Sequence, residues 1–124
     1  MAEEKKEKIK AHRSKIKSES EVIKKIYKFV ELLKQQGLNI SKIILFGSYA
    51  KGKASPDSDI DVVVVSNQFG RDTAEEMMLL RKIALKVDSH IEPVPLSPDD
   101  LTDKYSSFSR EINRYGIDIG IKGT

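Results

Sequence analysis

Apolar side chains recur early in the chain at the spacing of one helix face, and this pattern predicts a helix over residues 19–36. Ser18 and Glu21 have the spacing of a capping box at its start, and Gly37 is typical of the residue that ends a helix. The face expected to pack on a core consists of Val22, Ile23, Ile26, Phe29, Val30 and Leu33.

Three later segments have the patterns of β-strands. Residues 43–46 and 59–65 contain short apolar runs bounded by turn residues, as expected of strands that are buried on both faces. Residues 47–58, between them, are rich in Gly, Ser, Pro and Asp, and they predict a glycine turn, one short helical turn and a surface loop. Residues 89–97 are expected to be extended, and their two prolines confine them to the edge of a sheet or to a strand that ends there.

A second amphipathic helix is predicted after Asp72, which forms an N-cap and N3 pair with Glu75. Met77 and Met78 are both interpreted as core residues and not as part of a cofactor site. The side chains of this helix expected to face inward are Met77, Leu80, Ile83, Ala84 and Val87.

The last part of the chain predicts two helices and a short strand. Ser97 followed by Pro98 and two acidic residues is a compact helix start. Residues 108–115 are predicted to form a helix ended by Gly116, and residues 117–121 a final strand. The order of elements indicates an α/β or α+β fold, in which helices flank a small mixed β-sheet.

The composition fits one globular domain, because 39% of the 124 residues are hydrophobic and 33% are charged. Residues 1–18 carry few apolar side chains among alternating Lys and Glu, so we expect a charged tail or a loosely attached helix there and the domain over 19–124. No apolar run has membrane-spanning length, no secretory signal opens the chain, and cysteine is absent. We therefore expect a cytoplasmic protein without a membrane partner.

The net charge of +3 at first suggests a nucleic-acid partner. The basic excess, however, lies mainly in the first third of the chain, where lysines alternate with glutamates, and acidic residues outnumber basic ones from Asp57 onward. This distribution favours a solvated helix, so we do not expect nucleic-acid binding.

Candidate chemistry begins with Asp59 and Asp61, which lie directly against a run of four valines. Side chains two residues apart on a strand share a face, and no Lys or Arg lies within this strand to neutralise the pair. A Mg²⁺ ion between the carboxylates, completed by water and substrate phosphates, would relieve their repulsion. Alone, such a pair at a strand start is most often a turn with solvated carboxylates.

Gly47 and Ser48 follow the strand over 43–46 and open a short helix. A glycine lets backbone approach a ligand closely, and the N–H groups of a helix start bind phosphate, with the Ser48 hydroxyl as a further donor. Ser48 alone would be an ordinary N-cap. The Gly-Ser pair becomes specific because a ten-residue loop separates it from Asp59 and Asp61.

This combination resembles the minimal nucleotidyltransferases of the DNA polymerase beta superfamily, whose signature is Gly-Ser, a loop of this length and Asp-x-Asp. The resemblance extends over residues 43–101 and includes Ala50, Gly52 and Ser58 in the loop. The fold that it implies is a nucleotidyltransferase-like domain with a small mixed sheet.

The resemblance also implies further site residues. The family takes a third catalytic carboxylate from the strand after the next helix, and Glu92 is the candidate, although the family often has Asp there. Asp88 is the rival, and it ranks second because it lies at the end of the predicted helix. Lys51 or Lys53 would add positive charge to the nucleotide-binding loop.

The implied reaction transfers a nucleoside monophosphate, most simply AMP from ATP, to an acceptor hydroxyl. Two Mg²⁺ ions would be held by Asp59, Asp61 and Glu92, while Gly47 and Ser48 bind the β and γ phosphates. Positioning and charge stabilisation would supply most of the catalysis.

The acceptor is open at this point. Short chains of this family commonly pair with a HEPN-domain ribonuclease as toxin and antitoxin, and the nucleotidyltransferase adds AMP to a tyrosine of the HEPN protein. A first alternative is a homo-oligomer that modifies a small molecule such as an aminoglycoside. A second is a non-catalytic binding module that neutralises a partner protein.

Overall fold

The computed structural model describes residues 20–121. The predicted tail over 1–18, the proposed cap Ser18 and the start of the predicted domain at residue 19 lie outside the described residues. Residues 20–35 form the first described helix, which ends one residue before the predicted end. No helix within the described range is long and apolar enough to cross a membrane.

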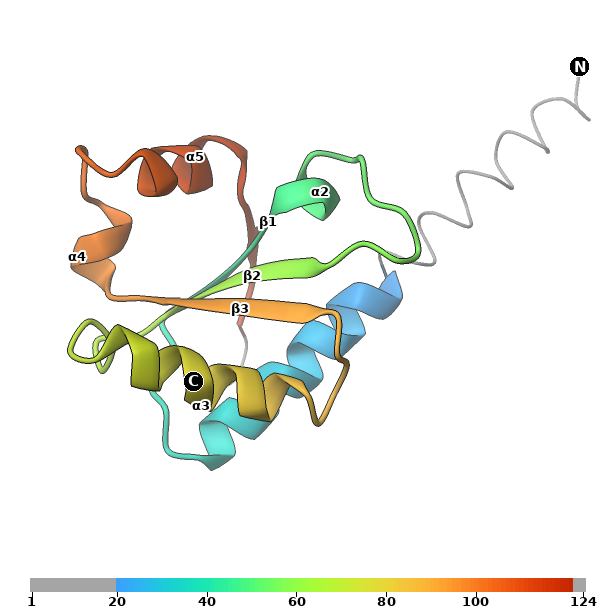
Figure 1. Ribbon diagram of the computed structural model, residues 1–124, viewed down its shortest axis with the longest axis horizontal. Coiled ribbons are helices and arrows are strands. Elements are labelled where there is room, and N and C mark those ends of the chain that lie inside the picture. Colours follow the sequence, from blue (N-terminus) through green and yellow to red (C-terminus); the bar gives the residue numbers. More distant parts are fainter. Residues whose placement is uncertain (1–19, 122–124) are drawn as a thin grey trace, which may run out of the picture.

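Four strands form one mixed sheet, in the order β3-β2-β1-β4 (Figure 1). The strands are β1 (Lys42–Phe46), β2 (Ile60–Val65), β3 (Ile91–Leu96) and β4 (Ile117–Ile119). β2 pairs with β3 in parallel, whereas β1 is antiparallel to both β2 and β4. The predictions of a small mixed sheet and of an edge position for the proline-containing strand are confirmed.

Helices cover both faces of the sheet. The helix over 20–35 and α3 (Thr73–Ala84) lie on one face, and α4 (Pro98–Leu101) and α5 (Ser107–Tyr115) lie on the other (Figure 1). The short α2 (Gly47–Ala50) follows β1 directly. The fold is therefore three layers, helix, sheet and helix, as the order of elements predicted.

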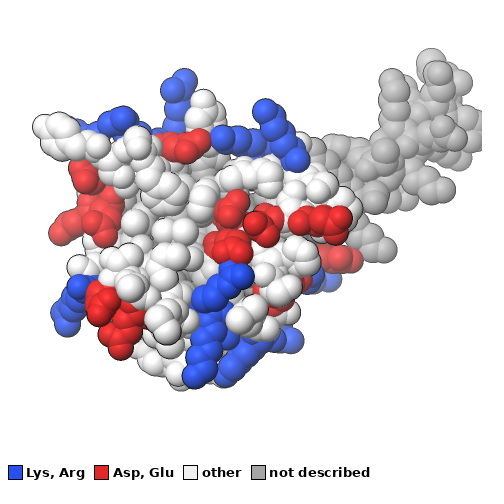
Figure 2. Space-filling view, viewed as in Figure 1, with Lys and Arg blue, Asp and Glu red and all other residues white. Residues whose placement is uncertain are grey.

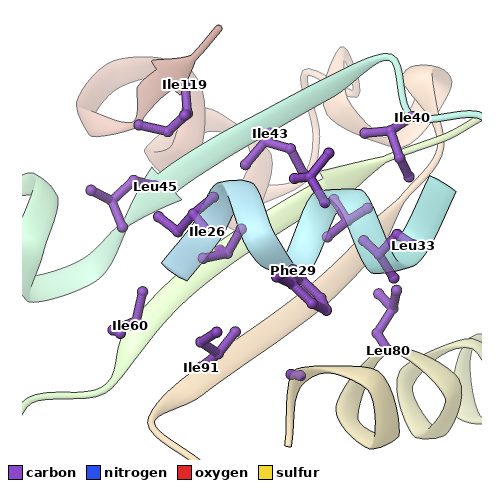
Figure 3. Packing of buried hydrophobic residues seen from close by; sticks show 14 of the residues in the cluster. Ile26, Phe29, Leu33, Ile40, Ile43, Leu45, Ile60, Leu80, Ile91 and Ile119 are labelled. Atoms are coloured by element: carbon purple, nitrogen blue, oxygen red, sulfur yellow. The ribbon is translucent and has the colours of Figure 1, made fainter. Parts of the chain in front are cut away.

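The larger core lies between the sheet and the helix over 20–35. Ile26, Phe29 and Leu33 point from that helix toward the strands (Figure 3), and all three side chains are fully buried. Successive valines of β2 point to opposite faces: Val62 and Val64 join this cluster, whereas Val63 and Val65 pack with α4 and α5. β2 is thus buried on both faces, which fixes the direction of the side chains at its start.

The interpretation of Met77 and Met78 as core residues is wrong. Their exposed fractions are 42% and 72%, while Leu80, Ile83 and Ala84 fill the inward face of α3. These three inward positions have helical spacing, and the methionines lie on the neighbouring, outward side of the helix. Val87, also expected on this helix, lies in the turn beyond its end and is half-buried.

The predicted helix starts are present as hydrogen bonds. Asp72 accepts from the backbone N–H of Glu75 at 3.1 Å, as expected for an N-cap. Ser97 and Asp100 form a reciprocal capping box at the start of α4. These local contacts fix where α3 and α4 begin, on either side of β3.

Candidate active site

The sheet topology brings the end of β1 and the starts of β2 and β3 to one edge. Phe46, the last residue of β1, is opposite Asp61, and Asp61 is opposite Glu92 on β3. Gly47 follows Phe46 immediately, so the Gly-Ser turn also reaches this edge. Antiparallel pairing on one side of β2 and parallel pairing on the other therefore assemble residues that are distant in sequence.

Asp61 is half-buried and Asp59 is exposed. Burial raises the pKa of Asp61, and the nearby negative charges of Asp59 and Glu92 raise it further. Acidic side chains gather in the middle of the face shown in Figure 2, with basic side chains above and below them. The carboxylates thus form one electrostatic group, whose repulsion a bound cation would reduce.

Gly47 lies against Asp61 in a way that only glycine permits. Its φ is +68°, and a Cβ atom added there would lie 2.1 Å from Oδ2 of Asp61. The backbone at the start of α2 therefore approaches the carboxylate directly. No side chain caps the N-terminus of this helix.

Tyr49 anchors α2 and the following loop, and it was not identified from the sequence. The ring is 8% exposed within the larger core, and its hydroxyl lies 3.5 Å from the Ser55 carbonyl oxygen, at the limit of a hydrogen bond. Ser55 donates its backbone N–H to the Ser58 hydroxyl at 2.8 Å, and Ser58 returns its own N–H to the Ser55 carbonyl at 3.0 Å. These contacts hold the loop between half-buried Ser48 and Asp59 in one shape.

Glu92 is oriented by Arg81, a residue of α3 that the sequence did not identify. The two side chains form an ion pair, and each is about two-fifths exposed. Arg81 Nη1 also donates to the Ile91 carbonyl at 3.4 Å, and the ion pair with Glu92 raises the pKa of the guanidinium. Only the packing of α3 on β3 brings this arginine to the carboxylates, so no signal in the sequence could have found it.

The sequence was compared with those of known protein families. The nucleotidyltransferase domain family matches residues 23–115. The chain belongs to this family. The expected enzyme class, a nucleotidyltransferase, is confirmed.

A relative from Methanocaldococcus jannaschii, named "Putative protein adenylyltransferase MJ0141", is 32% identical to this nucleotidyltransferase over 103 residues. The match covers 80% of this chain and 96% of the relative. A second relative from the same organism, "Putative protein adenylyltransferase MJ0604", is 36% identical over 95 residues, 75% of this chain and 92% of that one.

Two solved structures have the same fold. A chain of a toxin-antitoxin structure with AMP-PNP has a TM-score of 0.55 and 26% identity, and the match covers 79% of this nucleotidyltransferase and 72% of that chain. A "putative nucleotidyltransferase" from Sulfolobus solfataricus has a TM-score of 0.64 at 19% identity, with 85% of each chain covered. The nucleotidyltransferase fold expected from the sequence is confirmed.

The two loop lysines of the nucleotidyltransferase lie differently. Lys51 forms an ion pair of 3.0 Å with Glu111 and lies over the Tyr115 ring, so α5 holds its ammonium group. Lys53 is exposed, and its backbone N–H donates to the Ser48 carbonyl at 2.9 Å. Lys53 is the lysine whose side chain is better placed to reach a ligand, while Lys51 must first leave Glu111.

Asp88, the rival third carboxylate, is engaged elsewhere. It accepts from Lys25 Nζ at 2.5 Å and from the backbone N–H of His90 at 2.8 Å. In an additional contact, the His90 ring nitrogen Nδ1 lies 2.8 Å from Oδ1 of the same carboxylate. The hydrogen bond from Lys25, followed by those from His90, holds the pKa of Asp88 well below its usual range. Asp88 thus ties the helix over 20–35 to the turn before β3 and serves the fold.

Replacing Asp88 by asparagine is expected to lower the free energy of unfolding at pH 7 by about 1–2 kcal/mol, because two hydrogen bonds to a charged group are weakened. The folded-state pKa is below the unfolded one, so this stabilisation is present above about pH 4 and is lost as the pH falls further. Urea denaturation of the original chain and the variant measures the difference in stability at pH 7, and its decrease at about pH 3. Asp57→Asn, in the exposed loop, is the control; an equal loss in the two variants would contradict the assignment.

Mg²⁺, implied by the family resemblance, fits the aspartate pair of this nucleotidyltransferase. Carboxylate oxygens are the donors it prefers. Burial first and the charges of Asp59 and Glu92 second raise the pKa of Asp61, and a bound cation would offset both effects. Within residues 20–121, no three His, Cys, Asp or Glu side chains are arranged to hold one metal ion, and the Glu92 carboxylate pairs instead with Arg81. Asp59 and Asp61 are therefore the residues suited to hold the ion.

Proposed function

We propose that this protein is a Mg²⁺-dependent adenylyltransferase that transfers AMP from ATP to a hydroxyl group of another protein. The observation that carries the proposal is the close approach of Gly47 to Asp61, at the edge where Asp59 and Glu92 also lie. Glycine backbone beside clustered carboxylates suits a metal-bound triphosphate. The names of the two relatives from Methanocaldococcus jannaschii support a protein as the acceptor.

The roles of the residues follow from their positions. Backbone N–H groups at the start of α2 and the Ser48 hydroxyl would bind the phosphates, with Lys53 adding positive charge. Asp59 and Asp61 would hold Mg²⁺, which supplies charge neutralisation on the triphosphate and lowers the pKa of the attacking hydroxyl. Glu92, the third carboxylate, would orient that hydroxyl once it is released from Arg81.

We infer the direction of attack from the order of the strands. Asp61 lies on β2, between β1 and β3. α2 follows β1 and therefore lies on one side of Asp61, whereas Glu92 lies on β3, on the other side. In-line displacement places the attacking hydroxyl opposite the leaving pyrophosphate. With the phosphates at α2, the acceptor would therefore reach the site from the β3 edge.

The acceptor that we infer is a tyrosine of a HEPN-type ribonuclease toxin, which would make this protein its antitoxin. The neighbour from the toxin-antitoxin structure supports this setting, and AMP-PNP in that structure supports ATP as the nucleotide. Modification of an aminoglycoside is the weaker candidate, because the names of the two relatives from Methanocaldococcus jannaschii point to a protein acceptor.

The test is incubation with labelled ATP and Mg²⁺, with and without the protein encoded beside this chain's gene. We expect that protein to gain the mass of one AMP on a tyrosine, detected by mass spectrometry, and we expect no label without Mg²⁺. Kanamycin in place of the protein is the comparison for small-molecule acceptors. Label that appears only on kanamycin would exclude protein adenylylation.

A further inference from the structure

An apolar groove lies along the outside of the β3 edge. It is lined by Met77 and Met78 from α3, by Leu85 directly after that helix and by Pro93 of β3, and its volume is about 470 Å³. Met78 and Leu85 are seven residues apart and therefore lie on one face of the helix, beside the face that packs on the core. We name these four residues the α3 groove.

The side chains of this groove are unusually open to solvent for their type. The exposed fractions are 42% for Met77, 72% for Met78 and 54% for Leu85. A contiguous apolar patch of this kind on a small domain marks an interaction surface more often than scattered exposed residues do. Methionine also adapts its shape to a partner, because its side chain is unbranched and polarisable.

The groove is continuous with the candidate active site. Glu92 lines the groove and also contributes to the electrostatic group around Asp61. It lies on the side of Asp61 from which the acceptor is expected to arrive. An acceptor protein bound in the groove would therefore hold its hydroxyl group close to Glu92 and the candidate active site.

The groove has a basic rim. Arg81 and Lys82 both line it, and basic side chains lie over α3 directly below the acidic group in Figure 2. Arg81 is neutralised by Glu92 in this structure, whereas exposed Lys82 belongs to no ion pair within residues 20–121. An apolar floor with a basic rim is complementary to an apolar ridge flanked by carboxylates.

The backbone of β3 is poorly suited to docking by strand addition. Ile60 donates its N–H to the His90 carbonyl, so alternate residues, Ile91, Pro93 and Pro95, direct their backbone groups away from β2. Two of these have no N–H to offer, and the carbonyl of Ile91 accepts from Arg81 at 3.4 Å. These features favour recognition through side chains on this edge, as when a helix lies in a groove.

We propose that the α3 groove docks the acceptor protein, through a helix that presents an apolar ridge with acidic flanks and carries the modified hydroxyl toward Glu92. This inference rests on the proposed function and adds to it the surface and the chemistry of the partner. It assigns recognition to residues that lie outside the nucleotide site, so binding of MgATP does not depend on them.

The test is steady-state transfer of AMP to the protein encoded beside this chain's gene. Met78→Glu combined with Leu85→Glu should raise the KM for that protein by about tenfold or more, because a charge replaces apolar contact at the centre of the interface. The kcat at saturation and the MgATP affinity measured by calorimetry should not change. Leu79→Glu is the matched control: Leu79 has an exposed fraction of 39%, belongs to the same helix and does not line the groove.

The outcomes separate the docking surface from the proposed function. If the unmodified chain transfers no AMP to the protein, the proposed function fails and the docking proposal fails with it. If the unmodified chain is active and the double variant keeps its KM, or Leu79→Glu raises the KM equally, only the docking surface is overturned. Met78→Ala with Leu85→Ala gives the same test if the glutamate variants do not fold, since both positions are exposed.

Discussion

Replacing Asp59 and Asp61 together by asparagine is expected to abolish nucleotidyl transfer, with a loss of about a thousandfold or more. Asparagine keeps the size of each side chain but removes the negative charge on which cation binding at this edge depends. The measurement is label transferred from ATP to the acceptor protein, with Mg²⁺ titrated in each variant. Activity within about tenfold of the original would show that these carboxylates do not hold the metal.

The same experiment has a matched control in the loop. Asp57 is exposed and lies two residues before Asp59, so Asp57→Asn changes the net charge by the same amount per site. It should leave transfer nearly unchanged. A large loss in Asp57→Asn would mean that general electrostatics, and not two specific ligands, supports the reaction.

Asp61→Asn alone is also expected to keep or raise the stability of the fold at pH 7. Burial and the nearby charges of Asp59 and Glu92 raise the pKa of Asp61 in the folded state, so ionisation of this group opposes folding. The penalty is absent below the unfolded pKa of about 4 and grows as the pH rises toward the folded value. Thermal unfolding without Mg²⁺ at pH 7 measures it, and an inactive variant with an unchanged or higher Tm would separate catalysis from folding.

Replacing Gly47 by alanine is expected to have the second largest effect on activity. The added Cβ would lie 2.1 Å from Oδ2 of Asp61, so either the carboxylate or the start of α2 must move. Transfer depends on both positions to within fractions of an ångström, and we expect a loss of about a hundredfold or more. In addition, the φ of +68° is unfavourable for alanine and should lower the free energy of unfolding by about 1–2 kcal/mol.

Gly37→Ala is the matched control for the backbone cost. Gly37 has a φ of +82°, but nothing lies within 4 Å of the position where its Cβ would be. Both alanine variants should therefore lose the stability that the positive φ costs, and Gly47→Ala should lose at least as much as Gly37→Ala in urea denaturation. Only Gly47→Ala should lose transfer. Equal activity in the two variants would show that the approach of Gly47 to Asp61 has no role in the reaction.

The sequence was sufficient for features that depend on near neighbours along the chain. The period of the apolar residues fixed the strands and the amphipathic helices, because each element must bury one face or both. The caps at Asp72 and Ser97 were readable because a helix start is satisfied by residues within three positions. One short loop connects the Gly-Ser pair to the two aspartates, so the sequence alone identified a candidate site made of Gly47, Ser48, Asp59 and Asp61.

Other features depend on which elements pack together. The preference for Glu92 over Asp88 rested on resemblance, whereas the structure supplies a physical reason: parallel pairing places Glu92 opposite Asp61, and Lys25 holds Asp88 elsewhere. Arg81 reaches Glu92 only because α3 packs against β3. No short sequence pattern predicts such contacts, because each one joins segments that are distant in the sequence.

The two methionines show the same division. Periodicity established that α3 is amphipathic and placed Leu80 in the core, but it could not say how wide a stripe the sheet would cover. The width of the buried stripe depends on how closely α3 approaches β3. In this structure the stripe does not include Met77 or Met78, which are exposed. Local patterns in the sequence were enough to predict the helices, the strands and the nucleotidyltransferase motif. The ion-pair partners of the carboxylates and the groove beside them arise only when the helices pack on the sheet, because both are made by surfaces from different elements.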